Sequence, residues 1–145
     1  MPEAYVDATY LQETAEVLKH LKIHTYEWME ILPGDHVVDL GCGPGVDTIP
    51  IAKYVGKSGR VTGVDIDAEM IRKANEYAHQ KDVSHFVTHR IADVASLPFI
   101  SEEVDACRAE RLFQVLPPSI GIQKVFPEML RVTTTVKPSA PRTSQ

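Results

Sequence analysis

The sequence predicts a single α/β domain, built as a three-layer sandwich around a mostly parallel sheet. Short apolar runs alternate along the chain with amphipathic helical stretches, and a glycine-rich turn at residues 41–45 joins the first of these runs to the next helix. The 145 residues suffice for about one domain, and 43% apolar with 24% charged residues is an ordinary globular composition.

The first predicted elements are a helix over residues 11–32 and a strand over residues 37–40. Apolar side chains recur along the helix at a helical spacing, and Pro33-Gly34 should end it. The strand is apolar except for Asp39, which suits a strand that is buried on both faces.

The remaining elements continue this alternation. We expect helices over residues 46–55, 68–80 and 119–132, and strands over residues 60–65, 86–91 and 104–107. Asp67 is placed to cap the second of these helices, and Pro127 should kink or split the third. Residues 133–145 carry almost no apolar side chains, so we expect a flexible tail there, after a domain over residues 1–132.

Composition and charge argue against several classes of protein. The formal net charge of −5 disfavours nucleic acid as a partner, because phosphate binding favours a basic surface. No apolar run reaches the roughly 18 residues of a membrane helix, and the amino terminus lacks the regions of a signal peptide. Two cysteines are too few for a disulfide framework, which favours a reducing, cytoplasmic setting. His20 and His24 have a spacing that can bind metal, but no third ligand is evident, so no metal site is predicted.

The stretch from Asp39 to Gly45 is the strongest functional signal. Glycines at a strand-to-helix turn allow positive φ and let a ligand contact the backbone, and the helix that follows offers free N–H groups. Asp65 ends the next predicted strand, 24 residues after Gly41, where a carboxylate can accept hydrogen bonds from ribose hydroxyls. We therefore expect a ligand site at this end of the sheet.

Two other nucleotide-binding motifs fit less well. The nicotinamide or flavin fingerprint G-x-G-x-x-G needs a glycine where this chain has Val46, and a pyrophosphate disfavours a nearby carboxylate such as Asp39. A P-loop is excluded because no Gly-Lys-Ser/Thr follows the turn.

Four segments resemble, in order and in spacing, the motifs of the class I S-adenosylmethionine-dependent methyltransferases. They are residues 39–45 for the first motif, 61–67 and 91–99 for the second- and third-strand motifs, and 105–116 for the fourth strand and the helix turn after it. The closest likeness is to small-molecule methyltransferases of the ubiquinone/menaquinone-biosynthesis-like group, over roughly residues 21–132. It implies a Rossmann-like fold, S-adenosylmethionine as methyl donor and a small molecule as acceptor.

The resemblance also implies cofactor-binding residues. They are Asp39 for the methionine amino end; Gly41, Cys42, Gly43 and Gly45 for the loop under the methionine and ribose parts; Asp65 for the ribose hydroxyls; Ile66 and Met70 for the adenine faces; Asp93 with the Val94 backbone for the adenine amino group; and the backbone near Ala109 for the methionine part. No catalytic residue is assigned. Glu110 and Arg111 stay open between contact with the substrate or the cofactor's carboxylate and pairing with each other or with water.

A complete member of the resembled class has seven strands, whereas this chain gives signals for four. Strands five to seven are therefore expected to be missing, which implies a chain shortened at its carboxyl-terminal side. An uncovered sheet edge invites self-association, so a homodimer through that edge is a further expectation. The alternative to an active methyltransferase is a catalytically incomplete S-adenosylmethionine-binding fragment or interaction module.

Overall fold

The computed structural model describes residues 8–134 and divides the chain into two units, residues 1–30 and 31–145. Helix α1 (Ala8–Trp28) belongs to the first unit. The predicted helix over residues 11–32 runs too far, because two short i→i+3 hydrogen bonds close its last turn and Glu30 adopts a left-handed φ of 54°. No helix within residues 8–134, α1 included, is long and apolar enough to cross a membrane.

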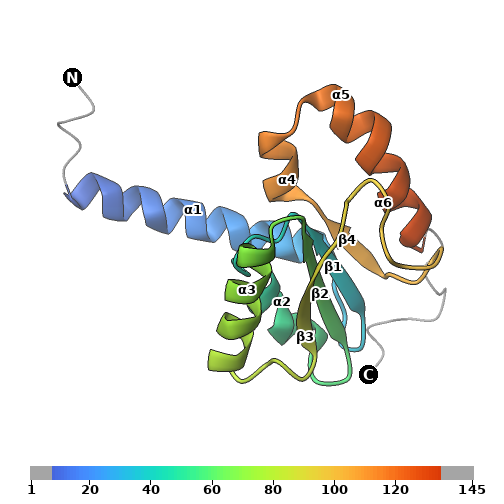
Figure 1. Cartoon of the computed structure of the whole chain (residues 1–145). Helices are drawn as coiled ribbons and strands as arrows, with labels where there is room; N and C mark the ends of the chain where they lie inside the picture. Colours follow the sequence, from blue (N-terminus) through green and yellow to red (C-terminus); the bar gives the residue numbers. More distant parts are fainter. Residues whose placement is uncertain (1–7, 135–145) are drawn as a thin grey trace. The chain divides into compact units, whose positions relative to one another are not determined.

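The second unit contains one parallel sheet of four strands (Figure 1). The strands are β1 (His36–Leu40), β2 (Arg60–Asp65), β3 (Val87–Ile91) and β4 (Ala106–Arg108), in the order β3-β2-β1-β4. All residues of β1 are buried, as expected for a central strand covered on both faces. The strand predicted over residues 60–65 matches β2 to the residue.

Helices α2 (Thr48–Val55) and α3 (Ala68–Gln80) pack against the first three strands. The expected helix over 68–80 is confirmed to the residue, and the Asp67 carboxylate caps it by accepting a 2.9 Å hydrogen bond from the Glu69 N–H. The other face of the sheet is covered by the β3–β4 connection and by the carboxyl-terminal helices (Figure 1). The core on that face includes Val38, Leu40, Val64, Leu97, Phe99, Val104, Ala109, Val125 and Val132.

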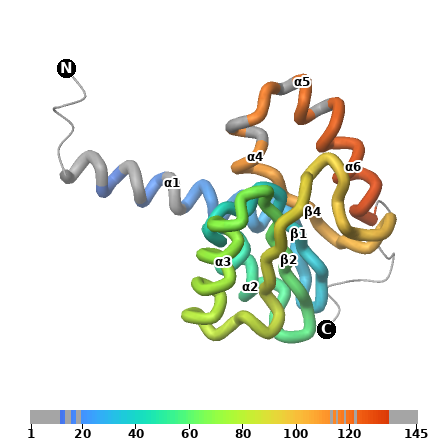
Figure 2. The backbone as a smooth tube through the Cα atoms, in the orientation of Figure 1, coloured from blue at the N-terminus to red at the C-terminus, as the bar shows by residue number. Residues whose placement is uncertain are grey.

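The carboxyl-terminal helical region is more broken than predicted. It consists of α4 (Glu110–Val115), α5 (Pro118–Ile120), the π-helical segment η2 (Gly121–Val125) and α6 (Phe126–Val132), which follow one another along the trace in Figure 2. The kink expected at Pro127 takes the form of η2, where the Phe126 N–H bonds to the carbonyl of Gly121, one residue further back than in an α-helix. Proline has no N–H to continue an α-helical ladder, so the wider turn lies just before it.

The fourth strand and the predicted tail both need correction. The strand expected over residues 104–107 is observed at Ala106–Arg108. Val104 instead forms a single parallel bridge with Thr133, with a 2.8 Å hydrogen bond from the Thr134 N–H to its carbonyl. The flexible tail expected over 133–145 is thus wrong for its first two residues, and its remainder lies outside the described residues.

Candidate functional site

A cavity of about 620 Å³ lies at the carboxyl ends of the strands. Carboxyl ends of parallel strands meet at one edge of a sheet, which is where ligands of open α/β folds bind. The cavity is lined by Gly41, Asp65, Ile66, Asp67, Met70, Ala92, Asp93, Val94, Arg111, Leu112 and Leu116. Six of the residues predicted from sequence therefore lie together: Gly41, Asp65, Ile66, Met70, Asp93 and Val94.

The turn between β1 and α2 needs glycine for two reasons. Gly41 and Gly43 have φ values of +70° and +56°, in the left-handed region that other residues rarely adopt. A Cβ atom on Gly41 would also lie 3.0 Å from the Cβ of Leu112. The backbone of this turn therefore packs directly against side chains from the first turn of α4.

The Asp65 carboxylate fixes the shape of the site. Its Oδ2 accepts a 2.9 Å hydrogen bond from the Gly43 N–H, and its Oδ1 accepts a 3.0 Å bond from the Asp67 N–H. One side chain thus joins the glycine turn to the turn that starts α3. Each oxygen keeps a lone pair for a further donor, because a carboxylate has about four acceptor sites.

Apolar groups, two further acids and one arginine, Arg111, form the rest of the lining. Ile66, just after β2, is 72% exposed, and Met70 lies in the first turn of α3, so both offer apolar surface to the cavity. Asp93 follows β3 and is exposed, and its Oδ1 accepts a 2.9 Å hydrogen bond from the Ala95 N–H.

The other predicted site residues lie outside the lining: Asp39, Cys42, Gly43, Gly45 and Ala109. Asp39 is 2% exposed within β1. Burial, followed by the negative charges of Asp39 and Asp65, raises the pKa of the Cys42 thiol. Cys42 is therefore a neutral thiol at physiological pH rather than a nucleophile.

A buried ion pair lies beside the glycine turn and was not predicted from sequence. Arg108, the last residue of β4, has its Nε 3.5 Å from Oδ2 of Asp47, and each side chain is 5% exposed. Arg108 also donates a hydrogen bond to Glu110. The pair joins the end of β4 to the start of α2, and no local pattern marks it because its members lie far apart in the sequence.

A second unpredicted network supports the turn from the opposite side. His89 Nε2 lies 2.6 Å from the Thr48 hydroxyl, and His89 Nδ1 lies 2.9 Å from Oδ1 of Asn75. Burial lowers the pKa of His89 to about 4, so the ring is neutral near pH 7. The Asn75 oxygen can only accept, so the ring proton is assigned to Nδ1 and the Thr48 hydroxyl donates to Nε2. Thr48 in turn lies under Gly45, because a Cβ on Gly45 would lie 3.4 Å from the Thr48 hydroxyl oxygen.

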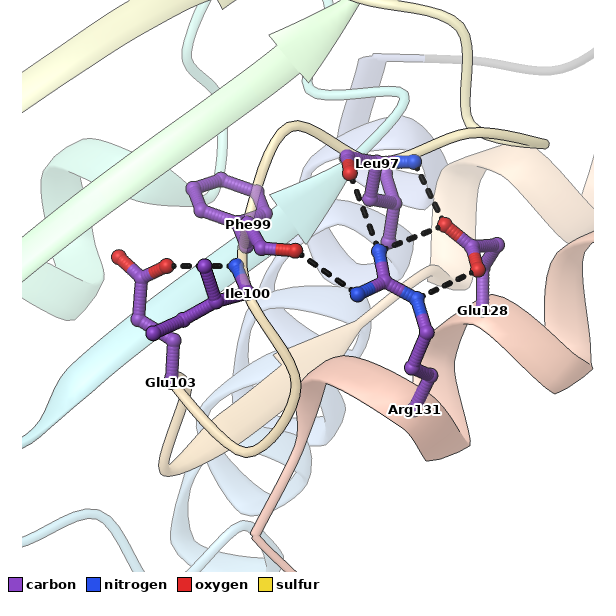
Figure 3. A network of polar contacts seen from close by, with 6 residues as sticks. All are labelled: Leu97, Phe99, Ile100, Glu103, Glu128 and Arg131. Atoms are coloured by element: carbon purple, nitrogen blue, oxygen red, sulfur yellow. Dashed lines mark hydrogen bonds and ion pairs between the residues drawn. The ribbon is translucent and has the colours of Figure 1, made fainter.

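The segment that follows Asp93 is bound to α6 by a charged pair (Figure 3). The Arg131 guanidinium donates to the carbonyls of Phe99 and Leu97, at 2.9 and 3.1 Å. Glu128 accepts from Arg131 at 2.7 Å and from the Leu97 N–H at 2.7 Å. The hydrogen bond with Arg131 lowers the pKa of Glu128 below its ordinary value. One helix turn thus fixes the backbone just after the acidic end of the cavity.

Comparison with known proteins places these features in context. The sequence pattern described as a methyltransferase domain matches residues 37–135. An arsenite methyltransferase from Halobacterium salinarum is 36% identical over 100 residues, which cover 69% of this chain and 25% of that protein. A demethylmenaquinone methyltransferase from Desulfitobacterium hafniense is 31% identical over 110 residues, or 76% of this chain and 41% of that protein. The chain thus spans less than half the length of these relatives.

A solved structure shows the same fold. The crystal structure of an S-adenosylmethionine-dependent methyltransferase from Aquifex aeolicus superposes with a TM-score of 0.64 at 22% identity, covering 91% of this chain and 65% of that one. At this identity the likeness shows the fold alone. It confirms the predicted Rossmann-like α/β architecture.

Proposed function

The chain belongs to the methyltransferase-domain family of class I S-adenosylmethionine-dependent enzymes, and on this premise we propose that it binds S-adenosylmethionine in the cavity and transfers the methyl group to a small molecule. The observation that carries the proposal is the gathering of Gly41, Asp65 and Asp93, with three further predicted residues, around one cavity. These residues come from three separate parts of the chain, and only the fold brings them together.

The lining matches the chemistry of an adenosine. Asp65 has free acceptor sites for the two ribose hydroxyls, and Asp93 is an acceptor for an adenine amino group. Ile66 and Met70 offer apolar surface for a flat ring. Gly41 lines the cavity with bare backbone, which the methionine part can contact.

Bound S-adenosylmethionine would supply a methyl group that is already activated by its positive sulfur. The residues of this chain then contribute to the reaction by holding the donor in place and restricting the movement of its ribose and adenine. Holding two reactants in line can lower the reaction barrier by roughly 7–11 kcal/mol. A general base is needed only where the acceptor must lose a proton.

The acceptor is proposed as a small molecule on two grounds. Two relatives are named for arsenite and demethylmenaquinone, which are small acceptors. The net charge of −5 disfavours a polyanionic acceptor such as nucleic acid. Apolar lining at Leu112 and Leu116 suits an acceptor with apolar surface.

Calorimetry with S-adenosylhomocysteine and the full chain tests the binding. Asp65→Asn should weaken binding at least about tenfold, because a charged acceptor for the ribose is lost. Asp82→Asn removes the same charge at a distant site whose left-handed φ of 60° asparagine tolerates, so it should leave the affinity unchanged. Binding of NADH in place of S-adenosylhomocysteine would overturn the proposal.

A screen with methyl-labelled S-adenosylmethionine tests the transfer. Arsenite, a demethylated quinol and other small acceptors are each incubated with the full chain, and label in the acceptor supports the proposal. Cofactor binding without transfer to any acceptor class would instead support the alternative, a binding module without catalysis.

A further inference from the structure

Arg111 is a cation placed over the glycine turn. It lies in the first turn of α4 and lines the cavity next to Gly41. A Cβ on Gly43 would lie 2.9 Å from Cζ of Arg111 and 3.0 Å from its Nε. The planar guanidinium group therefore packs directly against the backbone of the turn, and a Cβ at position 43 would displace it.

Arg111 has no protein partner among the described residues, and unlike Arg90 on β3, which also has none, it lines the cavity. Within residues 8–134 its nitrogens make neither a hydrogen bond nor an ion pair. The arginines that do pair with carboxylates are Arg60, Arg72, Arg108 and Arg131. Glu110, the neighbour that could have paired with Arg111, instead bonds to Arg108.

The charges that line the cavity are this cation and three carboxylates, Asp65, Asp67 and Asp93. The carboxylates suit a ligand part that carries hydroxyl and amino donors. An unpaired guanidinium suits a planar anion, because its fork of N–H groups matches a carboxylate with two parallel hydrogen bonds. A ligand with hydrogen-bond donors along one part and a carboxylate on another would satisfy both the carboxylates and the guanidinium of the lining.

We propose that Arg111 binds the carboxylate at the amino-acid end of S-adenosylmethionine and so selects ligands that carry it. The inference rests on the proposed function, which places the methionine part over the glycine turn where Arg111 lies. Asp39, assigned by resemblance to the amino end, lies outside the cavity lining, whereas Arg111 lies within it as the cation of the described lining.

Two probes that differ only in the carboxylate test the inference by calorimetry on the full chain. They are S-adenosylhomocysteine and its decarboxylated form, 5′-deoxy-5′-(3-aminopropylthio)adenosine. The unmodified chain should bind the first about tenfold to a hundredfold more tightly, as expected for a charge-assisted bond. In Arg111→Gln this ratio should fall close to one, because only the carboxylate-bearing probe loses a contact.

Two further variants control for charge and for geometry. Arg90→Gln makes the same change on β3, outside the cavity lining, and should keep the full ratio. Arg111→Lys keeps the charge but not the fork, so its ratio should be intermediate. Thermal unfolding of each variant confirms that the fold is retained.

The outcomes separate this inference from the proposed function. Equal weakening of both probes in Arg111→Gln, or an unchanged ratio, would overturn the role of Arg111 while leaving S-adenosylmethionine binding intact. Failure of the unmodified chain to bind either probe would overturn the proposed function and this inference together.

Discussion

The two halves of the sheet are held together by different means. In the first half, β2 pairs over five residues with β1 and over five with β3. In the second half, β4 pairs with β1 over only three residues, and the long connection before it is bound to α6 by Glu128 and Arg131. The first half is thus fixed by long backbone ladders and close packing, whereas the second combines a short ladder and an apolar core with a few charged side chains. Both halves line the same cavity, so its shape depends on two different kinds of interaction.

The largest effect should come from added volume in the first half. A Cβ on Gly63 would lie 2.6 Å from Cδ2 of His89 and 2.8 Å from both Cβ and Sγ of Cys42. Gly63→Ala should therefore lower the free energy of unfolding by about 3 kcal/mol, at the upper end for overpacked sites. Urea unfolding followed by circular dichroism measures this loss.

Gly56→Ala serves as the comparison for Gly63→Ala. Gly56 has a φ of +67°, but a Cβ at this position would meet no atom within 4 Å, so this variant carries backbone strain without crowding. Gly56→Ala should therefore lower the free energy of unfolding by less, about 1–2 kcal/mol. An equal or greater loss than in Gly63→Ala would show that close packing is not what fixes this half.

A pH effect should follow from His89 in the same half. Its pKa is about 4 in the folded chain against an ordinary 6.5, because burial disfavours the charged ring. The unfolded chain therefore binds a proton that the folded chain excludes, and stability present above pH 6.5 is lost as the pH falls toward 4. The full loss is on the order of 3 kcal/mol.

Urea unfolding between pH 7.5 and pH 4.5 measures this dependence. The free energy of unfolding should rise with pH over this range, and in His89→Gln the part of this slope that is due to the His89 proton should disappear. The exposed His85→Gln should keep it. A slope that is the same in all three chains would contradict a buried neutral imidazole at position 89.

The smallest effect is expected from Glu128 in the second half, and a matched pair of variants isolates it. Glu128 and Glu69 each bond to an arginine three residues later, but only Glu128 also accepts the Leu97 N–H from another segment. Glu128→Ala should lower the free energy of unfolding by about 1–2 kcal/mol, because that backbone donor loses its partner.

Glu69→Ala should leave the stability nearly unchanged, since exposed ion pairs contribute little. Hydrogen exchange of the Leu97 amide should also quicken in Glu128→Ala alone. Equal stability of the two variants would indicate that the connection to α6 does not depend on this bond.

Sequence patterns predicted the parts of this molecule that are determined locally. The strand Arg60–Asp65 and the helix Ala68–Gln80 match to the residue, because a short run with charged residues at both ends and a capped amphipathic period each mark their own ends. The glycine turn and the acidic residues at the strand ends could likewise be predicted from sequence, since they follow one another in a fixed order along the chain.

The missed features depend on residues that are distant in sequence. Val104 was predicted within β4 but bridges to Thr133, a partner that no local pattern specifies. The pair of His89 with Thr48 joins positions 41 residues apart, and Leu97 bonds to Glu128 across 31 residues. Such contacts follow from the topology of the sheet, so they become visible only once the strands are placed.

The two backbone bonds accepted by Asp65 bear on the thermodynamics of ligand capture. Because the Gly43 and Asp67 amides are already engaged within the protein itself, the conformational entropy of ordering the turn is lost during folding. A nucleoside entering the cavity then meets a rigid receptor, and its affinity reflects contact energy with little reorganisation.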